Sequence, residues 1–158
     1  MFNGLQQIGK LKGINFNDIK LANVFVIGDG SIPFTSMILA LLLPHSFKIF
    51  SIDPILDFDI TSLGKNSNID RIELHCKKSE DFVISESPGT DFMSIVIACH
   101  SHAPLEEFYN RISTMKKCAV SLPCCGKFWS IMKNIEPMAV YDDYEIFSPR
   151  RKVYLYSN

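Results

Sequence analysis

Short, continuous apolar runs recur along the chain from Asn23 onward and alternate with longer segments. The runs are residues 24–27, 47–52, 72–76, 93–98 and 118–122. They are rich in β-branched or aromatic residues and end in turn-forming or polar residues, which is typical of strands. Because their hydrophobicity is continuous and not alternating, they indicate a parallel sheet covered on both faces. Residues 34–43 and 105–115 have the length and apolar spacing of helices between such strands.

The end of the chain has a different pattern. Two strand-like runs, residues 139–147 and 152–156, are joined by a short turn, which predicts a terminal antiparallel hairpin. Residues 54–71 and 79–91 contain no long amphipathic helix, so one face of the sheet is expected to be lightly covered. We therefore predict an α/β protein with a mostly parallel, Rossmann-like sheet. An N-terminal helical or lid segment is expected at 1–22, and the main domain at 23–158.

Composition narrows the class of protein and its surroundings. The 158 residues are 47% hydrophobic and 21% charged, as in an ordinary soluble domain, and the net charge of -1 creates no field that attracts polyanions. The apolar run 37–43 ends at Pro44, too short to cross a membrane, and the N-terminus lacks a secretory apolar region. The five cysteines are odd in number and lack the spacing of a secreted disulfide scaffold, which favours reduced thiols. They include no CxxC pair, which argues against a structural zinc site. We expect an intracellular, cytoplasmic protein with no membrane partner.

The stretch VFVIGDGSIPFT, residues 24–35, joins the first expected strand to the first expected helix. Gly28 and Gly30 allow a sharp turn, and the backbone can then approach a ligand at the carboxyl end of the strand. The second strand ends in SIDP, which places Asp53 about 20 residues further on, where an acid accepts hydrogen bonds from ribose. These features predict nucleoside binding. The alternative is an ordinary turn in which Asp53 caps a helix.

GDGS followed by SIDP resembles motifs I and II of class I S-adenosylmethionine-dependent methyltransferases, over about residues 23–156. The resemblance implies a seven-stranded sheet with the last strand antiparallel, and S-adenosylmethionine as cofactor. Val26 and Ile32 stand where the family usually has an acid and a third glycine. The resemblance assigns the following residues to cofactor binding: Gly28, Asp29, Gly30 and Ser31 on the methionine and ribose side, Asp53 on the ribose, Ser79, Glu80 and Asp81 near the adenine, and Cys99 beside them.

A nicotinamide cofactor is the competing interpretation of the glycine motif. It fits less well, because GxGxxG requires glycine or alanine where this chain has Pro33. The terminal hairpin is also not expected in that class.

The fourth and fifth strands end in ACHSHAP and SLPCCGKFW, and these ends are expected to meet at one rim of the sheet. We predict that His100 and His102 act in catalysis, since imidazole is the commonest general base. Two alternatives are that Cys99, His100, His102, Cys124 and Cys125 hold a metal, or that they fill a tight junction. We predict no metal. The LPC sequence also invites comparison with the nucleophilic cysteine of cytosine-5 RNA methyltransferases, but the partner motif of those enzymes is missing.

Cations and aromatic residues gather in the last third of the chain. They can grip single-stranded nucleic acid or simply form a solvated edge of the hairpin. We predict a methyltransferase that acts on RNA or protein and works with a protein partner. The alternative is an inactive domain that serves as a binding or scaffold subunit. The clustered residues are Lys127, Phe128, Trp129, Lys133, Arg150, Arg151, Lys152 and Tyr154.

Overall fold

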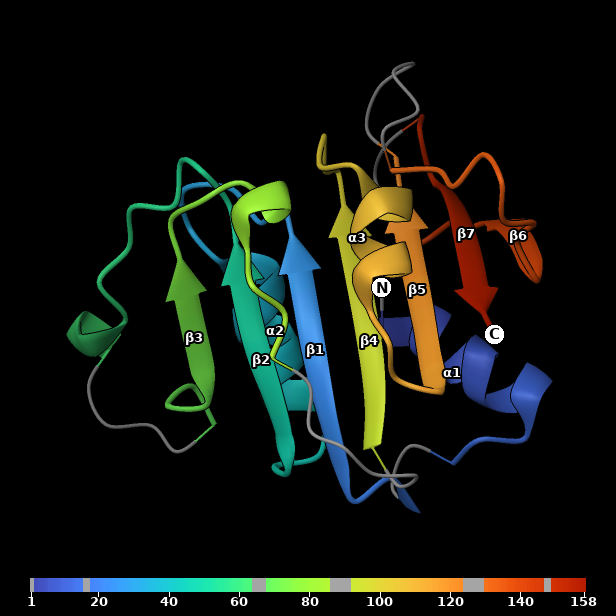
Figure 1. Ribbon diagram of the computed structural model, residues 1–158, viewed down its shortest axis with the longest axis horizontal. Helices are drawn as coiled ribbons and strands as arrows, with labels where there is room; N and C mark the ends of the chain where they lie inside the picture. Colours follow the sequence, from blue (N-terminus) through green and yellow to red (C-terminus); the bar gives the residue numbers. More distant parts are fainter. Residues whose placement is uncertain (1, 16–17, 64–67, 86–91, 124–129, 147–148) are drawn as a thin grey trace.

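The computed structural model describes residues 2–15, 18–63, 68–85, 92–123, 130–146 and 149–158 (Figure 1). The strands are β1 (Leu21–Ile27), β2 (Phe47–Ile52), β3 (Ile72–His75), β4 (Phe92–Cys99), β5 (Lys116–Leu122), β6 (Ala139–Asp142) and β7 (Lys152–Ser157). The helices are α1 (Phe2–Lys12), α2 (Phe34–Leu42) and α3 (Leu105–Arg111), with 3-10 turns η2 (Ile60–Leu63) and η3 (Ser79–Asp81).

All seven strands form one sheet, in the order β3-β2-β1-β4-β5-β7-β6. Strands β1 to β5 are parallel to one another, whereas β7 lies between β5 and β6 and is antiparallel to both. The fold prediction is therefore confirmed: the sheet is Rossmann-like and mostly parallel, and it ends in an antiparallel pair. The order reverses direction between β1 and β4, which is where open α/β sheets bind their ligands.

Helices cover the sheet from both sides (Figure 1). On one side, α1 and α2 bury residues such as Leu5, Ile8 and Leu39 against the strands. On the other side, α3 buries Leu105 and Phe108 against the same strands. Both faces of the central strands are thus in contact with apolar side chains, which explains the continuous hydrophobic runs in the sequence.

The N-terminal segment contains α1, whose Leu5 and Ile8 are fully buried against β5 and β7. Helix α1 therefore contributes to the hydrophobic core, and the two strands named here lie far from it in the sequence. Strand β1 begins at Leu21, inside the segment expected to precede the main domain. None of the helices in the described parts of the chain has the length and hydrophobicity needed to cross a bilayer.

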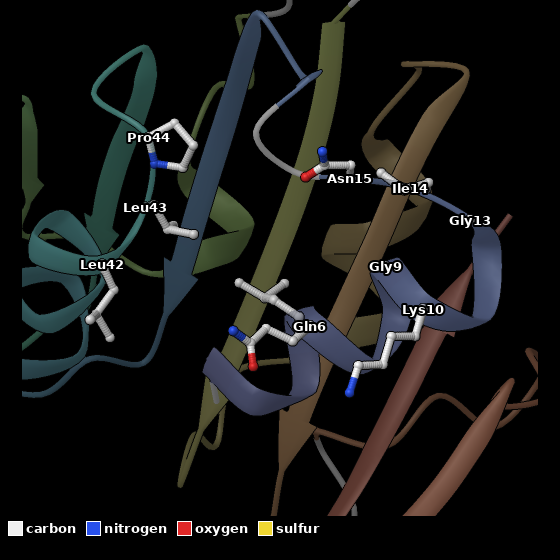
Figure 2. A pocket seen from close by; sticks show the side chains of 10 residues that line it. Gln6, Gly9, Lys10, Gly13, Ile14, Asn15, Leu42, Leu43 and Pro44 are labelled. Carbon is white, nitrogen blue, oxygen red and sulfur yellow. The ribbon is translucent and has the colours of Figure 1, made fainter.

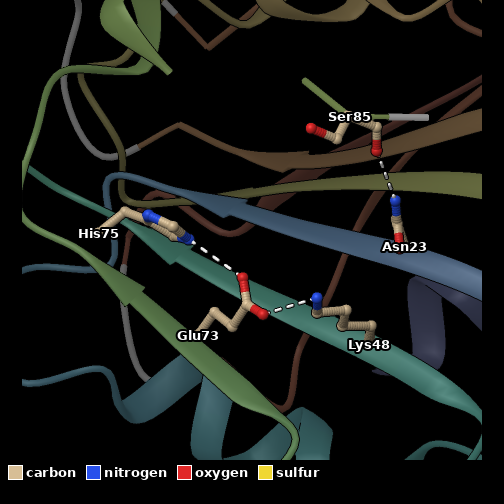
Figure 3. Close-up of polar contacts among 5 residues, drawn as sticks. All are labelled: Asn23, Lys48, Glu73, His75 and Ser85. Carbon is tan, nitrogen blue, oxygen red and sulfur yellow. Dashed lines mark hydrogen bonds and ion pairs between the residues drawn. The ribbon is translucent and has the colours of Figure 1, made fainter. Parts of the chain in front are cut away.

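The expected gap in helical cover lies over β2 and β3, on the side of α3. In the described part of the β3–β4 connection, η3 is the helical element, and a cavity of about 420 Å³ opens beside it. Lys48 Nζ lies 2.6 Å from Glu73 Oε1, and His75 Nε2 lies 3.5 Å from Glu73 Oε2 at the edge of this cavity (Figure 3). Polar and charged side chains thus occupy the surface that a helix would otherwise cover.

Two elements are shorter than the sequence predicts. Strand β6 stops at Asp142 because Asp143 starts a turn: its Oδ1 accepts a hydrogen bond from Glu145 N–H at 3.1 Å. Helix α3 stops at Arg111, where Lys117 Nζ donates hydrogen bonds to the carbonyls of Tyr109 and Ile112. A side chain from the following strand thus takes up the free carbonyls of the helix C-terminus.

Candidate functional site

A pocket of about 310 Å³ opens at the carboxyl ends of the strands, beside the point where the strand order reverses. Its walls come from four connections: the turn after β1, the loop after β2, the turn η3 after β3 and the loop after β4. The lining residues are Gly28, Ile52, Asp53, Pro54, Ile55, Lys78, Ser79, Glu80, His102, Ala103 and Pro104. Five of the predicted site residues, Gly28, Asp53, Ser79, Glu80 and His102, are among them.

Gly28 adopts a φ of 72°, in the left-handed region that favours glycine. A Cβ at this position would lie 2.1 Å from Ser101 Oγ, so the turn after β1 touches the loop after β4. Ser101 is itself buried, and its Oγ accepts a hydrogen bond from Ala103 N–H at 2.9 Å. The absence of a side chain at Gly28 therefore brings two walls of the pocket together.

Asp53 is nearly buried at the end of β2, and its carboxylate holds two loops in place. Its Oδ2 accepts a hydrogen bond from Gly30 N–H at 2.9 Å, and its Oδ1 accepts one from Ile55 N–H at the same distance. Each carboxylate oxygen can accept a second hydrogen bond. The Asp53 carboxylate can therefore hold the glycine turn in place and still accept hydrogen bonds from the hydroxyl groups of a ligand.

Asp29 has a structural role in the same turn. Its carboxylate accepts hydrogen bonds from Thr35 N–H, Ser36 N–H, Ser36 Oγ and Ser51 Oγ at distances of 2.5 to 3.2 Å. It thus satisfies backbone donors at the start of α2, where a negative charge is also favoured by the helix dipole. Asp29, Gly30 and Ser31 are not among the residues that line the pocket.

The turn η3 carries Glu80 into the pocket wall. Ser79 Oγ donates a hydrogen bond to Glu80 Oε2 at 2.8 Å. Arg111 of α3 donates to the carbonyl of Ser79 at 2.9 Å and to that of Phe82, so it holds both ends of the turn. Asp81, the neighbouring predicted residue, is exposed and lies outside the pocket lining.

The loop after β4 separates the two predicted histidines. His102 lines the pocket, whereas His100 is exposed and does not. His100 has a φ of 54°, uncommon for a residue with a side chain, and its N–H donates to the carbonyl of Leu122 at 2.8 Å. The backbone thus turns sharply at His100, directly after Cys99 ends the strand.

Cys124 and Cys125, along with Lys127, Phe128 and Trp129, lie outside the described residues, so the expected rim is described only on the β4 side. Among the residues that the structure describes, no group of three His, Cys, Asp or Glu side chains is arranged to hold a metal ion.

No protein-family model and no curated protein matches the sequence. Two solved structures of a mutant of MtNAS match the chain. One, in complex with S-adenosylmethionine, is 12% identical with a TM-score of 0.44, and the alignment covers 98% of this chain and 61% of that one. The other is 8% identical with a TM-score of 0.45 and coverage of 98% and 60%. The chain thus spans about three fifths of the length of these proteins.

Several residues of the pocket carried no signal in the sequence. Ile55 and Lys78 line it because the loops fold inward, and Ser101 supports it through its contact with Gly28. Only the position of Ser101 within the ACHSHAP stretch could have drawn attention to it.

Cys118 lies in β5, away from the pocket. It is fully buried, and burial raises the pKa of its thiol to about 12. The thiol therefore stays protonated at neutral pH and has the character of an inert core residue.

Proposed function

We propose that the chain binds S-adenosylmethionine in the pocket at the carboxyl ends of β1, β2, β3 and β4 and transfers its methyl group to RNA or protein. The observation that carries the proposal is the convergence of Gly28, Asp53 and Glu80 on one pocket from three successive strands. A glycine turn and an acid after the second strand are features by which a nucleoside is held. The resemblance to the methyltransferases adds Glu80, after the third strand, near the adenine.

The chemistry of these residues fits the cofactor. Asp53 retains acceptor capacity for the two ribose hydroxyls, since each of its oxygens accepts one hydrogen bond within the chain. Glu80 supplies a further acceptor on the η3 wall, and Ile55, on the loop after β2, supplies apolar lining. The pocket volume of about 310 Å³ is at the lower end of the range for small-molecule sites.

When bound, S-adenosylmethionine supplies an electrophilic methyl group attached to a positively charged sulfur. The residues of the chain would then have two tasks. Gly28 and Asp53 hold the nucleoside and fix its orientation, which lowers the entropic part of the barrier. His102, on the loop after β4, takes the proton that the acceptor hydroxyl or amine releases when its oxygen or nitrogen is methylated.

Cofactor binding is tested by titration calorimetry with S-adenosylmethionine and S-adenosylhomocysteine. We expect Asp53→Asn to weaken binding by about tenfold or more, because removing one charged acceptor costs on the order of 1–3 kcal/mol. Asp57→Asn is the matched control, since Asp57 is exposed on the same loop and does not line the pocket. A wild-type chain that binds neither compound would refute the proposal.

Methyl transfer needs its own assay, with labelled S-adenosylmethionine in a cell extract that contains RNA and protein acceptors. We expect incorporation with the wild type and a loss with His102→Ala, while His45→Ala, at the opposite end of the sheet, retains it. Cofactor binding with no incorporation in the extract would instead identify the chain as a binding or scaffold subunit.

A further inference from the structure

Helix α2 presents large apolar side chains to solvent as well as to the core. Phe34, Ile38, Leu41 and Leu42 are 62%, 55%, 60% and 48% exposed, and their spacing puts them on one side of the helix. The opposite side, with Leu39 and Ala40, is buried against the sheet. A helix that is apolar all round is normally buried all round. The exposed side, which we call the α2 stripe, therefore lacks a covering layer within this chain as described.

A groove continues the α2 stripe across the same face of the molecule. Its volume is about 650 Å³, and it runs from the end of α2 to α1 and the residues that follow α1 (Figure 2). Leu42 belongs to both the stripe and the groove, and the half-buried Pro44 extends the apolar surface, whereas Leu43 lines the groove but is buried. Ile32, which is 39% exposed, extends it at the other end of α2.

The α2 stripe alone is smaller than one side of a standard interface. With roughly 180–200 Å² for a fully exposed side chain of this size, the stripe exposes on the order of 400 Å² of apolar surface. A patch of this extent lies within the range of the largest apolar patch on a monomer, and such patches are often functional. It is about half of what one partner contributes to a standard interface, so a stable dimer must cover the groove as well. The groove supplies further area beside it.

We propose that α2 forms the centre of a two-fold interface between two copies of this chain. Ile38 is the midpoint of Phe34–Leu42. If two α2 helices lie antiparallel across a two-fold axis, residues at equal distances from Ile38 face one another. Phe34 then meets Leu42 of the partner subunit, and Ile38 meets Ile38 of the partner subunit on the axis. Phe34 of the partner subunit also reaches the end of the groove that Leu42 and Pro44 form.

The absence of charged residues on α2 favours a second copy of this chain as the partner over a different protein. Helix α2 contains no charged residue, so a two-fold contact brings no like charges together. Its polar side chains are Thr35 and Ser36, and Ser36 is buried and bonded to Asp29. The α2 stripe therefore offers no charged group by which a different partner would be selected, whereas it is complementary to itself. The net charge of -1 adds little repulsion between two copies.

The oligomeric state of the full chain tests the proposal by sedimentation equilibrium over a concentration series. We expect a dimer for the wild type. Ile38→Asp places two carboxylates on the axis and should weaken the dimer by about 100-fold or more. The matched control is Met115→Asp, because Met115 is 82% exposed and lies away from α2, at the start of β5. Circular dichroism melting checks that both variants are folded.

Cysteine cross-linking tests the antiparallel arrangement, in a Cys76→Ser background that removes an exposed native thiol. Chains with Phe34→Cys, mixed with chains with Leu42→Cys, should form a disulfide-linked dimer, whereas neither variant alone should do so. A wild type that stays monomeric, a dimer that survives Ile38→Asp, or cross-links between two Phe34→Cys chains would each overturn the proposal.

Discussion

Gly28 and Ser101 lie so close together that a Cβ on Gly28 would stand 2.1 Å from the Ser101 hydroxyl oxygen. Gly30, two residues away, has an even more positive φ of 88°, yet a Cβ there would meet nothing within 4 Å. The two glycines of the turn are thus required for different reasons. At Gly30 the reason is backbone conformation alone, and at Gly28 it is conformation together with contact.

Gly28→Ala should therefore destabilise the protein far more than Gly30→Ala. Left-handed backbone strain costs both variants about 1–2 kcal/mol, and only Gly28→Ala adds a clash with a buried side chain. We expect a total loss of on the order of 3 kcal/mol or more for Gly28→Ala. Urea unfolding of both variants measures the difference. Adding Ser101→Gly to Gly28→Ala should recover part of the loss, and equal costs for the two single variants would contradict the contact.

Asp29→Ala should lower the free energy of unfolding by on the order of 2–3 kcal/mol, because it leaves two backbone N–H groups and two serine hydroxyls without their acceptor. A double-mutant cycle with Ser51→Ala isolates one of these bonds, the 2.8 Å contact between Ser51 Oγ and Asp29 Oδ2. We expect a coupling energy of about 1 kcal/mol or more. Additive effects would show that Ser51 does not depend on Asp29.

Arg71 joins the end of α2 to the start of β2. Its guanidinium donates to the carbonyls of Ala40, Leu43, Pro44 and Phe47, and burial lowers its pKa from the usual value. Arg71→Met should lower the free energy of unfolding by on the order of 3 kcal/mol, since these carbonyls lose a charged donor. Arg71→Lys should restore only part of this, because an ammonium cannot reproduce the planar fork.

Thermal unfolding of both Arg71 variants, with Lys20→Met as a control for loss of an exposed charge, measures these costs. If Arg71→Lys is as stable as the wild type, the fork geometry is unimportant.

The Lys48–Glu73 pair should make stability depend on acid pH. The hydrogen bond from Lys48 holds the pKa of Glu73 below its usual value of 4.5. A carboxylate with a lowered pKa in the folded state contributes stability above its unfolded pKa and loses it as the pH falls through the folded value. Both side chains are about half exposed, so Lys48→Gln should cost no more than about 1 kcal/mol at neutral pH.

Urea midpoints of the wild type and Lys48→Gln, compared from neutral pH down to well below the usual pKa of Glu73, test this dependence. The difference in urea midpoint between the wild type and Lys48→Gln should disappear on acidification and become smaller with added salt. If the difference in urea midpoint stays constant with pH, Lys48 stabilises the protein through its contact with Phe50 instead.

The sheet could be predicted from the sequence because burial on both faces leaves a simple mark, the continuous apolar run. For the same reason, the exposed α2 stripe could not be predicted. Residues 37–43 are apolar throughout, so their pattern does not distinguish the side that faces the sheet from the side that faces solvent. Strand β6 is shorter than predicted because of a local turn at Asp143, and α3 is shorter because Lys117 of the next strand bonds to its last carbonyls, a contact that the sequence does not show.

The spacing of residues along the chain predicted the candidate site only in part. Gly28, Asp53, Glu80 and His102 come together because each follows a parallel strand, and parallel strands end at one edge. Asp29 was also predicted to bind the cofactor, but its carboxylate accepts hydrogen bonds from the hydroxyls of Ser36 and Ser51 and does not line the pocket. A local motif does not reveal such partners, because one of them is on another strand.

The position of β7 between β5 and β6 has a consequence for the order in which the chain folds. During synthesis β6 leaves the ribosome before β7, yet among the described strands it pairs with β7 alone. Helix α1, made first of all, also contacts β7. The earlier strands can pair as they emerge from the ribosome. The edge formed by β6 and the surface on which α1 packs are complete only when residues 152–157 have been made. Such long-range contacts slow folding, so nascent chains should protect β1 to β4 from hydrogen exchange before α1.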